Sequence, residues 1–141
     1  MRRLDARQVG NLLNLSTVLG VLIATAGGAR IRRGPHGLLL AEHSRLPLLL
    51  AGAMTIGNVV LTRRRFADLL AVFPRVLEHE SRHASQWLRW GGLPFLPVYL
   101  LGGLWSLVRT GHPAAGNPFE RAAGLADGGY PEVPVRRFRR R

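Results

Sequence analysis

One segment of the chain decides how its fold is interpreted: PRVLEHESRHASQWLRW, residues 74–90. Its proline stands first, where a missing N–H is tolerated because the first N–H groups of a helix have no partner within the helix. Leu77, Ala84 and Leu88 give the segment an apolar side that can pack against other elements. The pair Gly91-Gly92 follows and is typical of a helix end. The segment therefore predicts one long helix over residues 74–90.

His79 and His83 stand four positions apart in this helix, so their side chains project from one face, one turn apart. Two imidazoles at this spacing can hold one zinc ion at Zn–N distances of about 2.0–2.1 Å. Glu80 points beside that position, where it can take a proton from zinc-bound water, whose pKa the metal lowers to about 7. Gln86 lies on the same face. The pattern predicts a zinc site with Glu80 as the catalytic base; its alternative is a helix with two surface histidines.

A catalytic zinc site needs a third protein ligand, with water in the fourth place. The chain has no cysteine, so this ligand must be a nitrogen or oxygen donor, and Arg89 occupies the position six residues after the second histidine. The strongest candidate is Glu120, in a short helix that we expect to begin at Pro118 with Asn117 as its cap. A helix that returns antiparallel would place Glu120 opposite the two histidines. Its alternative role is to favour the helix dipole.

Two weaker candidates for the third ligand are Asp127 and His112, and Asp127 could instead orient a histidine N–H from outside the site. A hydrolase also needs a group that stabilises the negative charge that develops in acyl transfer. No spacing rule selects this group, and each of the four candidates has a structural alternative. They are Tyr99, Tyr130, His112 and Arg109.

The part of the chain before residue 66 predicts a helix and a small β-sheet. Residues 8–26 show a helical pattern that stops at Gly27-Gly28. An alternating segment, a Gly-Pro-His-Gly turn and an apolar segment follow over residues 29–41 and predict a β-hairpin. Residues 53–62 predict a further strand, interrupted at Gly57-Asn58 by a turn or a bulge.

From residue 66 onward the apolar period is helical. Apolar residues at 66, 69, 70 and 73 predict a helix before the one at 74–90, and residues 96–109 predict another. We therefore expect an α+β fold in which a small sheet, made of a hairpin plus an edge strand, packs with about four helices. Residues 1–127 form a single metallopeptidase-like domain in this interpretation, and residues 128–141 form a basic, disordered tail.

The chain is strongly basic, with a formal net charge of +12 and arginine at all 20 basic positions. The arginines cluster at residues 30–33, 63–65 and 136–141, without the interleaved aromatic residues that would stack on bases, so we expect no nucleic-acid partner. An anionic membrane surface stays open as a partner. The exclusive use of arginine suggests a bacterial source with GC-rich DNA.

Two uncharged stretches, residues 8–29 and 90–108, are long enough to raise the question of a membrane span, which needs about 18 apolar residues. Polar side chains and glycines dilute the first stretch, which has no clear signal-peptide cleavage site. Pro94 and Pro97 shorten the second, so a buried or surface-lying helix is favoured there. We expect a cytoplasmic or membrane-associated protein. The sequence sets no oligomeric state.

Residues 53–124 resemble the bacterial zincin-like metallopeptidases of the glutamate type. The resemblance rests on a Thr-Ile-Gly-Asn-Val-Val strand, the His-Glu-x-x-His-x-x-Gln motif, a Gly-Leu-Pro-Phe-Leu-Pro-x-Tyr segment and a final Asn-Pro-Phe-Glu-x-x-Ala. It implies that residues 54–61 bind extended substrate at the edge of the sheet. It also implies a zinc-dependent hydrolase that cleaves a peptide or protein substrate with Glu80 as base and with Zn²⁺ held by His79, His83 and Glu120.

Two other functions agree with the same residues. One is a non-catalytic, membrane-associated protein whose apolar stretches insert while its arginines bind anionic headgroups. The other is a zinc-stabilised binding module without turnover, for which a closed site is expected, with a fourth protein ligand such as His112 or Asp127.

Overall fold

The computed structural model describes residues 4–47 and 52–136. Within these ranges the chain forms six α-helices, one short 3₁₀ helix and four strands, which confirms the α+β fold class. In chain order the elements are α1 (Ala6–Leu13), α2 (Ser16–Ala26), β1 (Arg30–Arg33), η1 (Pro35–Gly37), β2 (Leu39–Glu42), β3 (Met54–Ile56), β4 (Val59–Leu61), α3 (Phe66–Val72), α4 (Val76–Arg89), α5 (Phe95–Thr110) and α6 (Pro118–Ala123).

The four strands form one mixed sheet in the order β1-β2-β4-β3. The predicted hairpin is confirmed, because β1 and β2 pair antiparallel with Arg30 opposite Glu42 and Arg33 opposite Leu39. β2 and β4 pair in parallel. β3 lies at the far edge of the sheet, antiparallel to β4.

The single strand predicted over residues 53–62 is wrong, because the chain turns back at Gly57-Asn58 and forms β3 and β4. Gly57 has a φ of +62°, and a Cβ there would lie 2.4 Å from the backbone nitrogen of Thr17, so the turn requires glycine. The backbone N–H of Asn58 donates to Thr17 Oγ1 at 3.1 Å and holds the turn against α2. Of residues 54–61, only those of β3 lie on a sheet edge, since β4 is paired on both sides.

The helix predicted over residues 8–26 is in fact two helices, α1 and α2, bent by 75°. The break follows from local side-chain hydrogen bonds: Asn14 Oδ1 accepts from the backbone N–H of Ser16 at 3.0 Å and from its hydroxyl at 2.7 Å. Leu15, between them, is left-handed with a φ of 67°. The predicted end is confirmed, because α2 stops at Ala26 with Gly27 as its C-cap.

The predicted helices after residue 66 are present. The segment at residues 74–90 is helical from Val76 to Arg89, because Pro74 and Arg75 form a turn before α4. Asn117 caps α6 as predicted, with its Oδ1 accepting a hydrogen bond from the backbone N–H of Phe119 at 3.0 Å.

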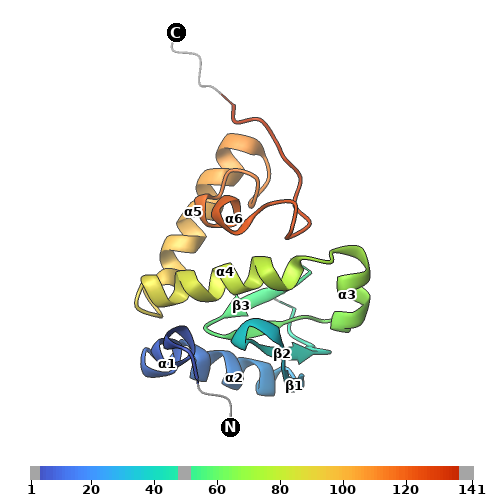
Figure 1. Ribbon diagram of the computed structural model, residues 1–141. Helices are drawn as coiled ribbons and strands as arrows, with labels where there is room; N and C mark the ends of the chain where they lie inside the picture. Colours follow the sequence, from blue (N-terminus) through green and yellow to red (C-terminus); the bar gives the residue numbers. More distant parts are fainter. Residues whose placement is uncertain (1–3, 48–51, 137–141) are drawn as a thin grey trace.

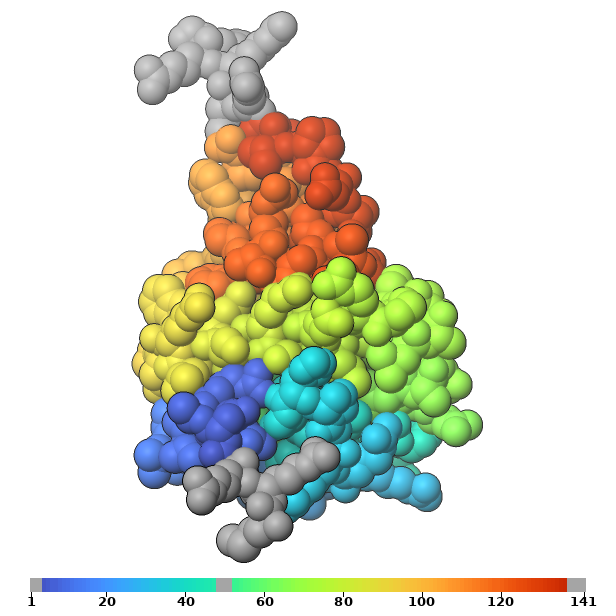
Figure 2. All heavy atoms as spheres, in the orientation of Figure 1, coloured from blue at the N-terminus to red at the C-terminus, as the bar shows by residue number. Residues whose placement is uncertain are grey.

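Helices α2 and α4 lie on opposite sides of the sheet (Figure 1). On the α4 side, Val60 packs with Phe66 and Leu69 of α3 and with apolar residues of α4. On the α2 side, Val59 and Leu61 pack with Ala24. Helices α5 and α6 lie beyond α4, where they form the narrower end of the molecule in Figure 2.

The two uncharged stretches of the sequence correspond to α1–α2 and to α5. Over the described residues, no single helix combines the length and the apolar composition of a membrane span, and only the bent pair α1–α2 reaches them together. Helix α5 has 16 residues, which at 1.5 Å per residue makes it about 24 Å long.

Candidate metal centre

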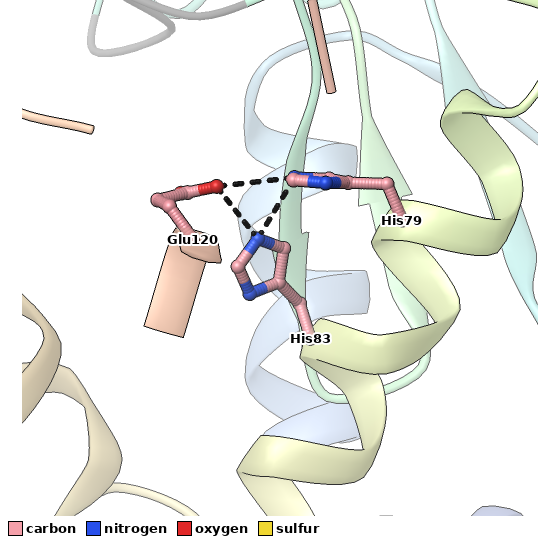
Figure 3. Close-up of side chains that lie close together, drawn as sticks. All are labelled: His79, His83 and Glu120. Atoms are coloured by element: carbon pink, nitrogen blue, oxygen red, sulfur yellow. Dashed lines mark hydrogen bonds and ion pairs between the residues drawn. The ribbon is translucent and has the colours of Figure 1, made fainter. Parts of the chain in front are cut away.

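The structure brings the three predicted ligands together in one cluster (Figure 3). His79 and His83 project from one face of α4, and Glu120 reaches them from the first turn of α6. Glu120 Oε2 lies 3.1 Å from His79 Nε2 and 3.2 Å from His83 Nε2, and the two ring nitrogens are 3.1 Å apart. The cluster is buried, with His79 only 1% and Glu120 only 2% exposed.

The spacing of the three donor atoms fits a tetrahedral metal ion. When zinc bonds are about 2.0–2.1 Å long, neighbouring ligand atoms of a tetrahedron lie about 3.3–3.4 Å apart. The observed separations of 3.1–3.2 Å are slightly shorter, so a small outward shift of the side chains would accommodate the ion. Two imidazoles and one carboxylate form a donor set that suits zinc.

The outer nitrogen of each imidazole donates a hydrogen bond to an oxygen. His79 Nδ1 donates to the backbone carbonyl of Gly124 at 2.8 Å. His83 Nδ1 donates to Gln86 Oε1 at 2.8 Å, and the Gln86 amide is fixed in this orientation because its Nε2 donates to the Phe119 carbonyl at 2.9 Å. Both neutral rings therefore direct the lone pair of Nε2 towards the carboxylate of the cluster. Three converging acceptors require a cation or a proton between them.

The pKa values of the cluster agree with this requirement. Burial lowers the pKa of His83, but its hydrogen bond with Glu120 and the charges of Glu80 and Glu120 outweigh burial and raise this pKa to about 9. Burial raises the pKa of Glu120, but its hydrogen bonds with His79 and His83 outweigh burial and hold this pKa below its usual range. The centre of the cluster is therefore arranged to hold positive charge.

Tyr99 supports the third ligand. Its hydroxyl donates to Glu120 Oε1, which leaves Oε2 to face the two histidines. Burial raises the pKa of Tyr99, so the hydroxyl keeps its proton at neutral pH. Tyr99 was a candidate for stabilising charge on a substrate, and the structure places it on the metal ligand instead. Its distance of 21 residues from Glu120 gives no sequence signal for this contact.

Glu80 lies between α4 and the edge strand β3. It is 4% exposed, and the hydroxyl of Thr55 donates to Glu80 Oε2 at 2.5 Å. Trp87 Nε1 donates to the carbonyl of Thr55 at 2.9 Å and ties β3 to α4. The charge of Glu80 also contributes to the raised pKa of His83, so the two side chains lie within electrostatic reach of each other.

Residues 124–130 cover His79. A Cβ on Gly128 would lie 2.5–2.8 Å from three atoms of the His79 ring, so the backbone at Gly128 rests directly on the imidazole. The ring of Tyr130 follows, with its centroid 5.9 Å from that of His79. Residues 128–136 were predicted as part of the tail; they contain no helix or strand, yet the first of them contribute to the site. Residues 137–141 lie outside the described residues.

The structure does not place Asp127 or His112 in the cluster. Asp127 Oδ2 accepts from Arg82 Nη1 at 3.1 Å, and Asp127 Oδ1 lies 3.8 Å from Arg75 Nε. The predicted role of Asp127 in orienting a histidine N–H is therefore wrong, since Gly124 and Gln86 hold those nitrogens. The ring of His112 accepts a hydrogen bond from the backbone N–H of Ala114. Over the described residues, only His79, His83 and Glu120 converge as a candidate metal site.

Comparisons of the chain with models of protein families, with characterised proteins and with solved structures gave no match. The resemblance to bacterial zincin-like metallopeptidases therefore stays a prediction. The function of the cluster rests on the chemistry of its own residues.

Proposed function

We propose that this chain is a zinc-dependent hydrolase that acts on peptide bonds, with zinc held by His79, His83 and Glu120. The observation that carries the proposal is the convergence of three buried acceptor atoms within 3.1–3.2 Å of one another. Burying three such acceptors without a cation is costly, because each loses its contact with water. Zinc would supply a Lewis acid that polarises a carbonyl and lowers the pKa of a water molecule.

Glu80 is the proposed catalytic base. Its carboxylate takes the proton of the attacking water and returns it to the leaving amine. The hydroxyl of Thr55 holds one carboxylate oxygen at 2.5 Å and so fixes the orientation of the base. Thr55 belongs to β3, the edge strand, whose outer side is the place where an extended peptide could add to the sheet. The base and the candidate substrate strand are therefore in direct contact.

Tyr130 is the proposed donor to the negative charge that develops on the substrate. Its ring packs against His79. Burial raises the pKa of Tyr130, so the hydroxyl stays protonated and can donate a hydrogen bond. Of the other candidates, Tyr99 is engaged by Glu120, and the guanidinium of Arg109 lies over the ring of Trp105, 4.9 Å from its centroid.

A zinc-stabilised binding module without turnover is the second candidate. The observation in its favour is the burial of the ligands beneath residues 124–130, since a substrate must reach a catalytic ion. A hydrolase requires this cover to move aside, whereas a structural site does not.

The test is zinc content and peptide cleavage of the purified full chain. We expect about one zinc per chain, retained in Glu80→Gln and lost in His79→Ala and Glu120→Ala. His43→Asn is the matched control, because His43 is exposed and asparagine tolerates its left-handed backbone. Cleavage of a mixed peptide library should disappear in Glu80→Gln.

Two results would overturn the proposal in different ways. Wild-type protein with no zinc, even after zinc is added, would end the metal assignment. Stoichiometric zinc with no cleavage by the wild type, or with equal cleavage by Glu80→Gln, would end the hydrolase assignment and leave the binding module.

A further inference from the structure

Helix α5 has its most apolar face on the outside. Its inward positions follow one helical stripe and include small and polar residues: Tyr99, Gly102, Ser106 and Thr110. Its outward positions carry large apolar side chains that are 44–65% exposed, among them Leu96, Leu100, Leu101, Leu104 and Trp105. A helix exposed to water normally shows the reverse arrangement. The environment for which the outer face of α5 is suited is therefore apolar.

The same arrangement continues beyond α5. The α4–α5 turn exposes Trp90 and Leu93, and the α1–α2 corner exposes Leu13 and Leu15. The turn and the corner are in contact, since a Cβ on Gly92 would lie 2.8 Å from the carbonyl oxygen of Asn14. These elements lie along one side of the molecule, the left side in Figure 1. We refer to the exposed apolar residues of α5, this turn and this corner as the apolar flank.

The apolar flank is basic at its margins and lacks acidic residues. No Asp or Glu occurs at residues 6–41 or 81–119, which supply all of its elements. Arg89 precedes Trp90 at one end of α5, and at the other end Arg109 lies over Trp105. The backbone N–H of Arg136 donates to the carbonyl of Arg109 at 2.8 Å, which brings the start of the arginine-rich C-terminus to the same end. Tryptophan and arginine at both ends of an apolar helix suit a membrane interface.

We propose that the apolar flank docks on an anionic lipid bilayer, with α5 lying in the plane of the headgroups and its arginines on lipid phosphates. At about 24 Å, α5 is too short to cross a hydrocarbon core of about 30 Å, but an apolar face of this length can lie at the boundary. A second copy of the chain is a poorer partner, because two chains of charge +12 repel and the flank offers no carboxylate to an arginine. The proposal does not depend on zinc or on hydrolysis.

The test is sedimentation of the full chain with vesicles of phosphatidylcholine alone or with about a quarter phosphatidylglycerol. We expect binding to the anionic vesicles, weakened by high salt, and a blue shift in tryptophan emission as Trp90 and Trp105 leave water. Leu101→Asp, at a position 65% exposed, should weaken binding about ten-fold or more, because aspartate is excluded from the apolar layer. Val72→Asp, on α3 and 63% exposed, is the matched control and should bind like the wild type.

Three outcomes would overturn the proposal. The first is a wild-type chain that stays in the supernatant with anionic vesicles. The second is salt-sensitive binding without an emission shift and unaffected by Leu101→Asp, which would mean that the arginines alone bind lipid. The third is a discrete dimer in analytical ultracentrifugation that Leu101→Asp dissociates, which would identify a second copy as the occupant. Thermal melts establish that each variant is folded, and the emission shift of the wild type requires no variant.

Discussion

The contact between Gly128 and His79 gives a prediction whose size follows from the structure. In Gly128→Ala the new Cβ would meet the His79 ring at 2.5–2.8 Å. An unstrained carbon contact is about 3.5 Å or longer, so the imidazole and residues 124–130 must separate by about 0.7–1 Å. Metal–ligand distances tolerate only about 0.2 Å. We therefore expect zinc affinity to fall about 10–100-fold, as it does when an oriented ligand is disturbed, and stability to fall by about 1–3 kcal/mol from overpacking.

The assay is competition for zinc with a chromophoric chelator, together with thermal melts in the presence and absence of zinc. Gly103→Ala is the matched control, because a Cβ there would make only ordinary contacts at 3.7 and 3.8 Å and the residue lies within α5. An unchanged dissociation constant for Gly128→Ala would refute the inference that this backbone rests on a metal ligand. Lower zinc affinity with faster peptide cleavage would show instead that the cover limits access.

Three further predictions concern single side chains. Tyr99→Phe removes the hydrogen bond to Glu120 Oε1 and should weaken zinc binding about 10–100-fold in the same chelator assay, whereas equal affinity would contradict the supporting role of that hydroxyl. Tyr130→Phe should keep zinc and lower kcat about 100-fold or more if its hydroxyl stabilises developing charge; an unchanged kcat would exclude that role. Glu42 accepts from the backbone N–H of Phe66 at 2.9 Å, and this bond, followed by the hydrogen bond from Arg32, lowers its pKa against the opposing effect of burial. Because a lowered carboxyl pKa stabilises the fold above the unfolded-state value and loses that effect as pH falls through the folded value, Glu42→Ala should cost about 1 kcal/mol at pH 7 and progressively less below about pH 4 in urea titrations; a constant difference would contradict it.

The ligands could be predicted from the sequence because each follows a local rule. His79 and His83 share a helix face by spacing alone, and Glu120 follows a recognisable cap. The partners of their outer nitrogens differ in this respect. Gln86 lies one turn from His83 and could be expected, but the carbonyl of Gly124 belongs to a loop, and a backbone carbonyl leaves no mark in a sequence.

The errors in the predicted fold also have local causes. Both the bend between α1 and α2 and the turn between β3 and β4 interrupt an apolar pattern that continues across them. At Asn14 a side chain competes with the helix for the backbone N–H of Ser16, and at Gly57 the approach of α2 leaves no room for a side chain. Periodicity reports which faces are apolar, and it does not report where a side chain or a neighbouring backbone redirects the chain.

The order of the ligands along the chain has a mechanical consequence. His83 and Glu120 are 37 positions apart, and α5 lies wholly between them. An ion coordinated by both would act as a cross-link that closes this loop, and a cross-link of such span restricts the unfolded chain by about 4 kcal/mol. Removing the ion would therefore release the tether at both ends of α5 at once. Limited proteolysis with and without chelator should locate the new cleavages at residues 91–117.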